Sequence, residues 1–467
     1  MIPMPKALGT PVDVPHRSRR WLWGIVFLGF VLRIAALALI HSSAPVGEEA
    51  IYCSRAFAWN NAPVSPADDE RAPAVLYLYR GVVVLFGENL SILRFANVLL
   101  GTIFLPLFYA WSRRVAGENI ALAGTLLAAV HPELIFYSAS LWNEPLYLVV
   151  IYSLFLFFLH VDRPPTPVQA IFLGFLLGLT SLTREIGVFL APLVVAAILL
   201  SIRSAPKRSF LAASLCLTAF FLTMLPWSIH ISQRAGHPVF ITDMNTRRLF
   251  VGITDVPEQA PHAMTVRHTS GYKAYRELSS DPRERQAMAR GMILEEIRRE
   301  LPWWPIEKTK QELPNFFSPN SLPAARLMAN PEETGWAERW AFRFSIPKIN
   351  RRQAGLALGA LTIAFHVAIT LAGSAGLVLL PLRRAALPIL VFGFMHLAPT
   401  LVTTACSRYR IPLTPIFILG AAALLVQGPR LWMDAGRTRR LAGCAVFLLA
   451  AIILALRIQS ILTPQYG

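Results

Sequence analysis

The chain has 467 residues, of which 55% are hydrophobic and 15% are charged, and its mean hydropathy is +0.50. Long apolar runs in such a composition exclude a soluble globular protein and predict an all-α polytopic membrane protein. The net charge of +17 does not indicate a nucleic-acid partner, because the basic residues cluster between apolar runs and follow no recognition motif.

The lengths of the apolar runs predict about eleven transmembrane helices. We expect them near residues 21–41, 91–112, 118–136, 141–160, 168–183, 186–202, 209–230, 355–380, 386–404, 410–427 and 441–460. With the N-terminus in the cytoplasm, this count makes every internal loop basic, as the positive-inside rule requires. The basic positions are Arg113 and Arg114, Arg163, and residues 203–208, 383–384 and 430–440.

Two loops on the outer side are long. We expect the first, residues 42–90, to hold interfacial helices at 48–59 and 74–86. The second, residues 231–353, is too long for a simple connector and predicts a small external subdomain with an amphipathic helix over 283–301. The predicted parts are a catalytic membrane module (1–230), the external subdomain (231–353) and the C-terminal transmembrane helices (354–467).

Polar residues gather at the outer ends of the predicted spans, although they come from separate parts of the chain. Arginine binds phosphate through a fixed fork of donors, and a neighbouring carboxylate can accept a proton from a hydroxyl. The pattern therefore predicts a site for an anionic lipid headgroup at the outer leaflet. Its candidate residues are Glu48, Glu49, Arg71, Tyr137, Asn143, Glu144, Arg184, Glu185, Arg408, Tyr409 and Arg410.

Six short segments carry these residues or lie beside them. In chain order they are GEEAIY (47–52), ERAP (70–73), ILRF (92–95), WNEP (142–145), LTRE (182–185) and RYRIPL (408–413). Together they resemble the motifs of the GT-C glycosyltransferases, especially the branch of bacterial protein O-mannosyltransferases and aminoarabinose transferases. Two positions depart from the family's pattern: Glu48 stands where Asp is common, and Ala72 replaces the first of two prolines.

The resemblance implies a GT-C-like helical bundle and an inverting transfer of a sugar from a polyprenyl-phosphate carrier to an acceptor hydroxyl. The basic loops put the site on the outer face of the membrane, and the Arg- and Ala-rich composition indicates a bacterium, in which that face is periplasmic. The expected partners are the lipid-linked donor, membrane lipid, and an acceptor that is a protein, a lipid or a glycan. A divalent metal ion is the one cofactor that the resemblance leaves open.

The resemblance also suggests a role for each candidate. Glu48 is the expected general base, and Glu49 and Glu144 are the supporting acids or metal ligands. The leaving phosphate needs fixed cations, which Arg71, Arg184 and Arg408 would supply. The other expected substrate-binding residues are Tyr137, Asn143, Tyr409 and Arg410.

Other interpretations of these residues stay open. A transporter or flippase could use the outer carboxylates as ion sites, although transporters place such groups near the bilayer midplane. A ligase that moves a preassembled glycan, or an inactive scaffold, would share the same membrane arrangement. The acids also suit the first turn of a helix, Arg184 and Glu185 suit a solvated turn, and Arg408 and Arg410 suit snorkelling at the end of a span.

Overall fold

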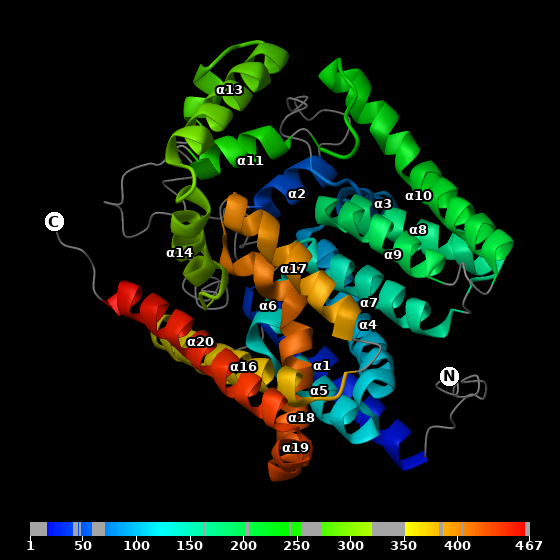
Figure 1. The fold of residues 1–467 in the computed structure, drawn as a ribbon, viewed down its shortest axis with the longest axis vertical. Helices are drawn as coiled ribbons and strands as arrows, with labels where there is room; N and C mark the ends of the chain where they lie inside the picture. The colour runs from blue at the N-terminus through cyan, green and yellow to red at the C-terminus, as the bar shows by residue number, and fades with distance from the viewer. Residues whose placement is uncertain are drawn as a thin grey trace.

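A computed structural model describes most of the chain. The described residues are 16–40, 45, 48–57, 71–161, 164–200, 205–242, 244–253, 273–319, 351–382, 386–403 and 405–462. Within these ranges all regular structure is helical (Figure 1). Glu70 and several of the basic positions used for topology, namely Arg163, Arg203, Arg383 and Arg384, lie outside them.

The N-terminal half forms a bundle around α4. Its elements are α1 (His16–Ile40), α4 (Leu90–Ala116), α5 (Glu118–Val130), α6 (Pro132–Ala139), α7 (Glu144–His160), α8 (Pro167–Thr183), η2 (Glu185–Phe189), α9 (Leu190–Leu199) and α10 (Pro206–Ala235). Local sequence sets several of the ends. Asn89 caps α4 by accepting the N–H groups of Ser91 and Ile92, and Thr166 forms a capping box with Gln169 at the start of α8.

The run expected to form one span over 118–136 is broken. Helices α5 and α6 meet at a bend of 56°. Pro132 is the first residue of α6, and His131 before it is extended, because a residue that precedes proline is disfavoured in the helical region. The bend redirects α6 and carries the chain into the turn that precedes α7.

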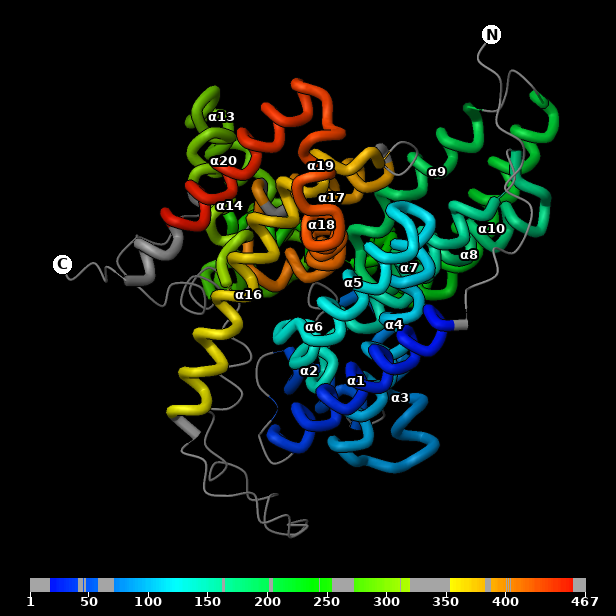
Figure 2. The backbone as a smooth tube through the Cα atoms, turned by 90° about the horizontal axis from the view of Figure 1, so that it is seen from below, coloured from blue at the N-terminus to red at the C-terminus, as the bar shows by residue number. Residues whose placement is uncertain are grey.

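The C-terminal helices form the opposite flank. They are α16 (Arg351–Leu379), α17 (Ala386–Val402), the 3-10 helix η6 (Ser407–Leu413), α18 (Thr414–Gln427), α19 (Pro429–Asp434) and α20 (Arg437–Leu462). Helices α16 and α18 approach closely, since a Cβ at Gly376 would lie only 2.0 Å from the Gly420 carbonyl oxygen. Figures 1 and 2 both show α10 on one side of the bundle and α16 with α20 on the other.

The two long loops that the sequence analysis expects on the outer side fold against this bundle. The first holds α2 (Glu48–Phe57) and α3 (Ala74–Phe86), which pack through an edge-to-face contact of Tyr52 with Tyr79. The end expected for the first helix, at residues 58–59, lies outside the described residues. The second loop holds α11 (Met244–Ile253), α13 (Pro282–Glu300) and α14 (Trp304–Phe316), and α13 covers the helix expected over 283–301.

The protein is a multi-pass membrane protein. Six of the described helices are long and apolar enough to cross a bilayer, and the bent pair of α5 and α6 makes a seventh candidate span. Helices α7, α8, α9 and α17 are apolar but shorter. Large apolar side chains remain outside the core, with Phe27 68% exposed and Leu222 61% exposed, as surfaces that face lipid require.

Candidate active site

Arg408 lies between two carboxylates. Its Nη1 atom is 2.5 Å from Glu48 Oε2, and its Nε atom is 3.1 Å from Glu144 Oε1. The guanidinium also lies over the ring of Trp142, with its carbon 5.0 Å from the ring centre. One cation therefore joins the start of α2 to the start of α7, two elements far apart in sequence.

Two more arginines extend this contact into an alternating chain of charges. Arg71 Nη1 lies 2.8 Å from Glu48 Oε1, and Arg184 Nη1 lies 3.7 Å from Glu144 Oε1. The order is thus Arg71, Glu48, Arg408, Glu144, Arg184. The Glu144 side chain is fully buried, whereas that of Glu48 is 24% exposed. The chain of charges leads from the interior to an accessible edge.

A fourth arginine was missed from the sequence. Arg248, on α11 in the long loop over 231–353, pairs with Glu185 and lies close enough to Glu48 to lower the pKa of that carboxyl. No motif surrounds it, so no signal in the sequence separated it from the other basic residues of this loop. A solvated turn was one of the two open interpretations of Glu185, which forms this ion pair beside the site.

Competing effects act on the carboxyl of Glu48. Burial raises its pKa, but the positive charges of Arg408 and Arg71 outweigh burial and lower the pKa to about 2. Glu48 is therefore ionised at neutral pH, with an arginine on each oxygen. A carboxylate paired with two arginines has a low proton affinity and is a weak base. Its proton affinity would rise if these arginines bound another anion instead.

Aromatic and amide side chains line the buried end. The rings of Tyr137 and Trp142 meet edge to face, with their centres 5.5 Å apart. The guanidinium carbon of Arg184 lies 5.4 Å from the centre of the Tyr409 ring. Asn143 is buried directly before Glu144, and its side-chain oxygen has no hydrogen-bond partner among the described residues. This group is polar yet largely shielded from water, which suits recognition of sugar hydroxyls.

Glu49 does not join this cluster. Its carboxylate accepts hydrogen bonds from Arg94 Nε at 2.9 Å and Nη2 at 3.2 Å, and from the backbone N–H of Leu141 at 3.0 Å. Arg94 also donates to the Ile40 carbonyl. Glu49 and Arg94 are both fully buried, so this pair ties α2 to α4 and to the turn before α7.

Arg410 also points away from Arg408. Its Nη1 and Nη2 atoms donate to the two oxygens of Glu133 at 3.0 and 2.8 Å, and Nη2 donates to the Ser318 carbonyl at 3.2 Å. This bidentate buried pair anchors η6 to α6. Glu133 was not among the predicted residues, because its partner lies far away along the chain.

The described residues do not fit a divalent metal ion. Such an ion needs several oxygen ligands, but Glu49 is taken up by Arg94 and Glu144 faces two arginines. No group of three or more His, Cys, Asp or Glu residues suited to a metal occurs in the described part of the chain. We therefore derive no step through a metal.

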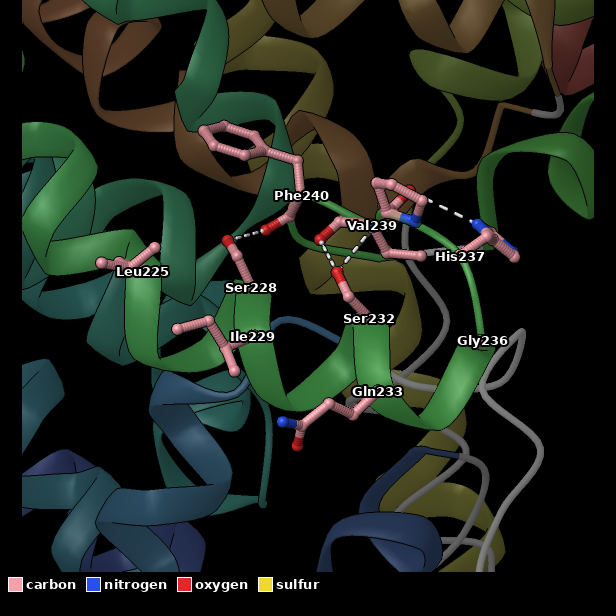
Figure 3. A pocket seen from close by; sticks show the side chains of 10 residues that line it. Leu225, Ser228, Ile229, Ser232, Gln233, Gly236, His237, Val239 and Phe240 are labelled. Carbon is pink, nitrogen blue, oxygen red and sulfur yellow. Dashed lines mark hydrogen bonds between the residues drawn. The ribbon is translucent and has the colours of Figure 1, made fainter.

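An open groove of about 710 Å³ lies elsewhere, between the end of α10 and the segment that follows it. Figure 3 shows Ser228 and Ser232 directing their hydroxyls to the carbonyls of Phe240 and Val239. The hydroxyls are thereby engaged, and the remaining lining is mostly apolar. None of the arginines or carboxylates of the site lines this groove.

The fold and the site define a helical membrane protein with a partly buried set of arginines and carboxylates. Residues 70–230 match the model of the family described as dolichyl-phosphate-mannose-protein mannosyltransferase. Over these residues the chain is similar to this glycosyltransferase family, which confirms the predicted resemblance. No curated protein matches the sequence.

Solved structures show similarity over most of the chain. The apo oligosaccharyltransferase of Archaeoglobus fulgidus is 14% identical with a TM-score of 0.48, covering 96% of this chain and 56% of that one. ArnT from Cupriavidus metallidurans, bound to undecaprenyl phosphate, is 15% identical with a TM-score of 0.42, covering 87% and 78%. The archaeal enzyme was also solved with Zn and sulfate (14% identity, TM-score 0.47, covering 94% and 53%). The chain thus spans little more than half the length of the archaeal protein.

Substituting Glu49 tests whether it supports the fold. We expect Glu49→Gln to lower the free energy of unfolding by about 3 kcal/mol, because it leaves the buried Arg94 without its counter-charge. Thermal unfolding of the purified protein in detergent measures this. The control is Glu307→Gln in the exposed Lys310–Glu307 pair, where a loss within about 1 kcal/mol is expected. An equal effect of the two substitutions would contradict the assignment.

Proposed function

We propose that this protein is an inverting glycosyltransferase that moves a hexosyl or pentosyl group from a polyprenyl-phosphate carrier to an acceptor hydroxyl. The observation that carries the proposal is the sharing of Arg408 by Glu48 and Glu144. This sharing supports a role for Glu48 as a general base beside cations for a leaving phosphate. The family match over residues 70–230 supports the same chemistry.

The proposed reaction is a single displacement. The acceptor oxygen attacks the anomeric carbon of the donor sugar, on the face opposite the phosphate, and the bond between that carbon and the phosphate oxygen breaks. The acceptor proton passes to the Glu48 carboxylate, and the bonding electrons leave with the lipid phosphate. Positioned general-base catalysis of this kind typically contributes about 10²- to 10⁴-fold.

The arginines would stabilise the charge that develops on the leaving phosphate. Arg408 and Arg71 are the nearest to the base, Arg184 lies on the buried side, and Arg248 approaches from the external loop. When the donor phosphate takes over these cations, the Glu48 carboxylate is released. Its proton affinity then rises, so binding of the donor would activate the base.

Glu144 and its neighbours would bind the sugar. Glu144 is buried and held by Arg184 and Arg408, which keeps its oxygens at the inner end of the site. Asn143, Tyr137 and Tyr409 complete this end and offer polar atoms to the sugar hydroxyls. Arg410 would support η6 and would not bind the phosphate, because its guanidinium is paired with Glu133.

We also propose the topology expected from the sequence. Six long helices, one bent pair and the four shorter helices α7, α8, α9 and α17 would together form eleven spans. Basic loops would then face the cytoplasm, and the site would face the periplasm of a bacterial inner membrane. The external loop over 231–353 would connect the catalytic module (1–230) to the C-terminal helices (354–467). It would also bind the acceptor, which is a protein, a lipid or a glycan.

Removing the charge of Glu48 tests the base directly. We expect Glu48→Gln to lower transfer by about 10²-fold or more without changing expression or thermal stability. The assay follows loss of the sugar from a polyprenyl-phosphate donor in membranes. Glu307→Gln, in an exposed pair with Lys310, serves as the control and should keep full activity. Undiminished turnover in Glu48→Gln would remove this residue as the base.

The pH dependence tests the arginines around the base. Because the pKa of Glu48 is lowered to about 2, its protonation should not limit kcat/KM of the wild type above about pH 4. Arg71→Gln removes one of the cations, so the pKa rises and activity falls at a higher pH during acidification. Profiles of kcat/KM against pH measure the shift. An acidic limb unchanged in Arg71→Gln would show that Arg71 does not tune this carboxyl.

A further inference from the structure

A buried ion pair occurs on α14, outside the cluster of catalytic charges. Lys308 Nζ lies 2.8 Å from Glu312 Oε1, and their side chains are 8% and 2% exposed. The same helix carries a second pair, Lys310 with Glu307, whose side chains are 67% and 65% exposed. The exposed pair contributes little to the free energy of folding. Burying two charges costs free energy unless the donor and acceptor atoms not used within the pair also form hydrogen bonds.

Lys308 and Glu312 each form a further hydrogen bond to the backbone of another segment. Lys308 Nζ donates to the carbonyl of Gly252, near the end of α11. Glu312 Oε2 accepts the backbone N–H of Ala405 at 2.7 Å, just ahead of η6. The pair therefore joins three pieces of chain, and we name this set of Lys308, Glu312, Gly252 and Ala405 the α14 junction.

Packing of the backbone reinforces the α14 junction. A Cβ on Gly252 would lie 2.6 Å from the Thr403 carbonyl oxygen, so only glycine allows α11 to rest directly on this strip of backbone. Helix α14 contacts both α17 and η6. In Figure 1 it descends from α13 and α11 towards the C-terminal helices.

Both segments held by the α14 junction carry arginines of the site. Arg248 lies one helical turn before Gly252 on α11, and Arg408 follows Ala405 by three residues. On its other side, η6 is anchored by the pair of Arg410 with Glu133. The backbone that carries Arg408 is thus held from the bundle by Glu133 and from the external loop by Glu312.

We propose that Glu312, held by Lys308, is a positioning residue that fixes the backbone ahead of η6 and so keeps Arg408 between Glu48 and Glu144. This inference rests on the proposed function, because it assigns Arg408 to the donor phosphate. It gives the external loop a second task beside meeting the acceptor. A displacement of about 1 Å at such a distance from the chemistry is enough to weaken a site severely.

The test measures the dissociation constant for undecaprenyl phosphate, a ligand that needs no turnover, together with KM and kcat for a polyprenyl-phosphate sugar. Glu312→Leu removes the acceptor for the Ala405 N–H and should raise the dissociation constant and KM about tenfold, the factor that one charge-assisted hydrogen bond represents. Glu312→Gln keeps an acceptor oxygen at this place and should recover most of the affinity. Glu307→Leu, on the same helix, should match the wild type.

A fold defect is separated from a positioning defect by a further variant. Lys308→Met combined with Glu312→Leu removes both buried charges, a change that buried pairs often tolerate. This double variant should remain folded by thermal unfolding yet bind undecaprenyl phosphate as weakly as Glu312→Leu. If Glu312→Leu does not fold, the double variant alone decides the matter.

The outcomes distinguish the two proposals. Wild-type affinity and KM in Glu312→Leu, or in the double variant when the single one does not fold, would overturn the positioning role and leave the proposed function intact. Failure of the wild type to bind undecaprenyl phosphate or to use any polyprenyl-phosphate sugar would overturn the proposed function and, with it, this inference. A tenfold loss that Glu312→Gln reverses would support both.

Discussion

The guanidinium of Arg408, shared by the carboxylates of Glu48 and Glu144, is the contact on which the rest of the site depends. Charges of one sign would not remain close together in a partly buried setting, and Arg408 makes their approach possible. The resting site is therefore closed by its own ion pairs. In the proposed mechanism, the donor phosphate binds these arginines in place of Glu48, so that donor binding also releases the base.

This arrangement needs a rigid frame, and the frame is built from neighbours of the same residues. Glu49 adjoins Glu48 in sequence, yet it points into the bundle and pairs with Arg94. Arg410 lies two residues after Arg408 and pairs with Glu133. Successive residues of a helix point in different directions, so one short acidic or basic motif supplies both a residue of the proposed site and the anchor that holds it.

The sequence predicted much of the fold, because long apolar runs and proline or glycine punctuation are local signals. It predicted a polytopic membrane protein and a resemblance to a glycosyltransferase family, and both are confirmed. The predicted span over 118–136 runs through the bend at His131, although Pro132 and the acidic Glu133 are local signals of a break. Arg248 and Glu133 were missed for another reason: their partners lie far away along the chain, and only tertiary packing brings Arg248 to Glu185 and Glu133 to Arg410.

A structure of the protein with undecaprenyl phosphate bound tests the central claim most directly. The account predicts that the phosphate contacts the guanidinium of Arg408 and that Glu48 has lost at least one of its two arginine partners. A phosphate bound elsewhere, with Arg408 still between Glu48 and Glu144, would contradict it.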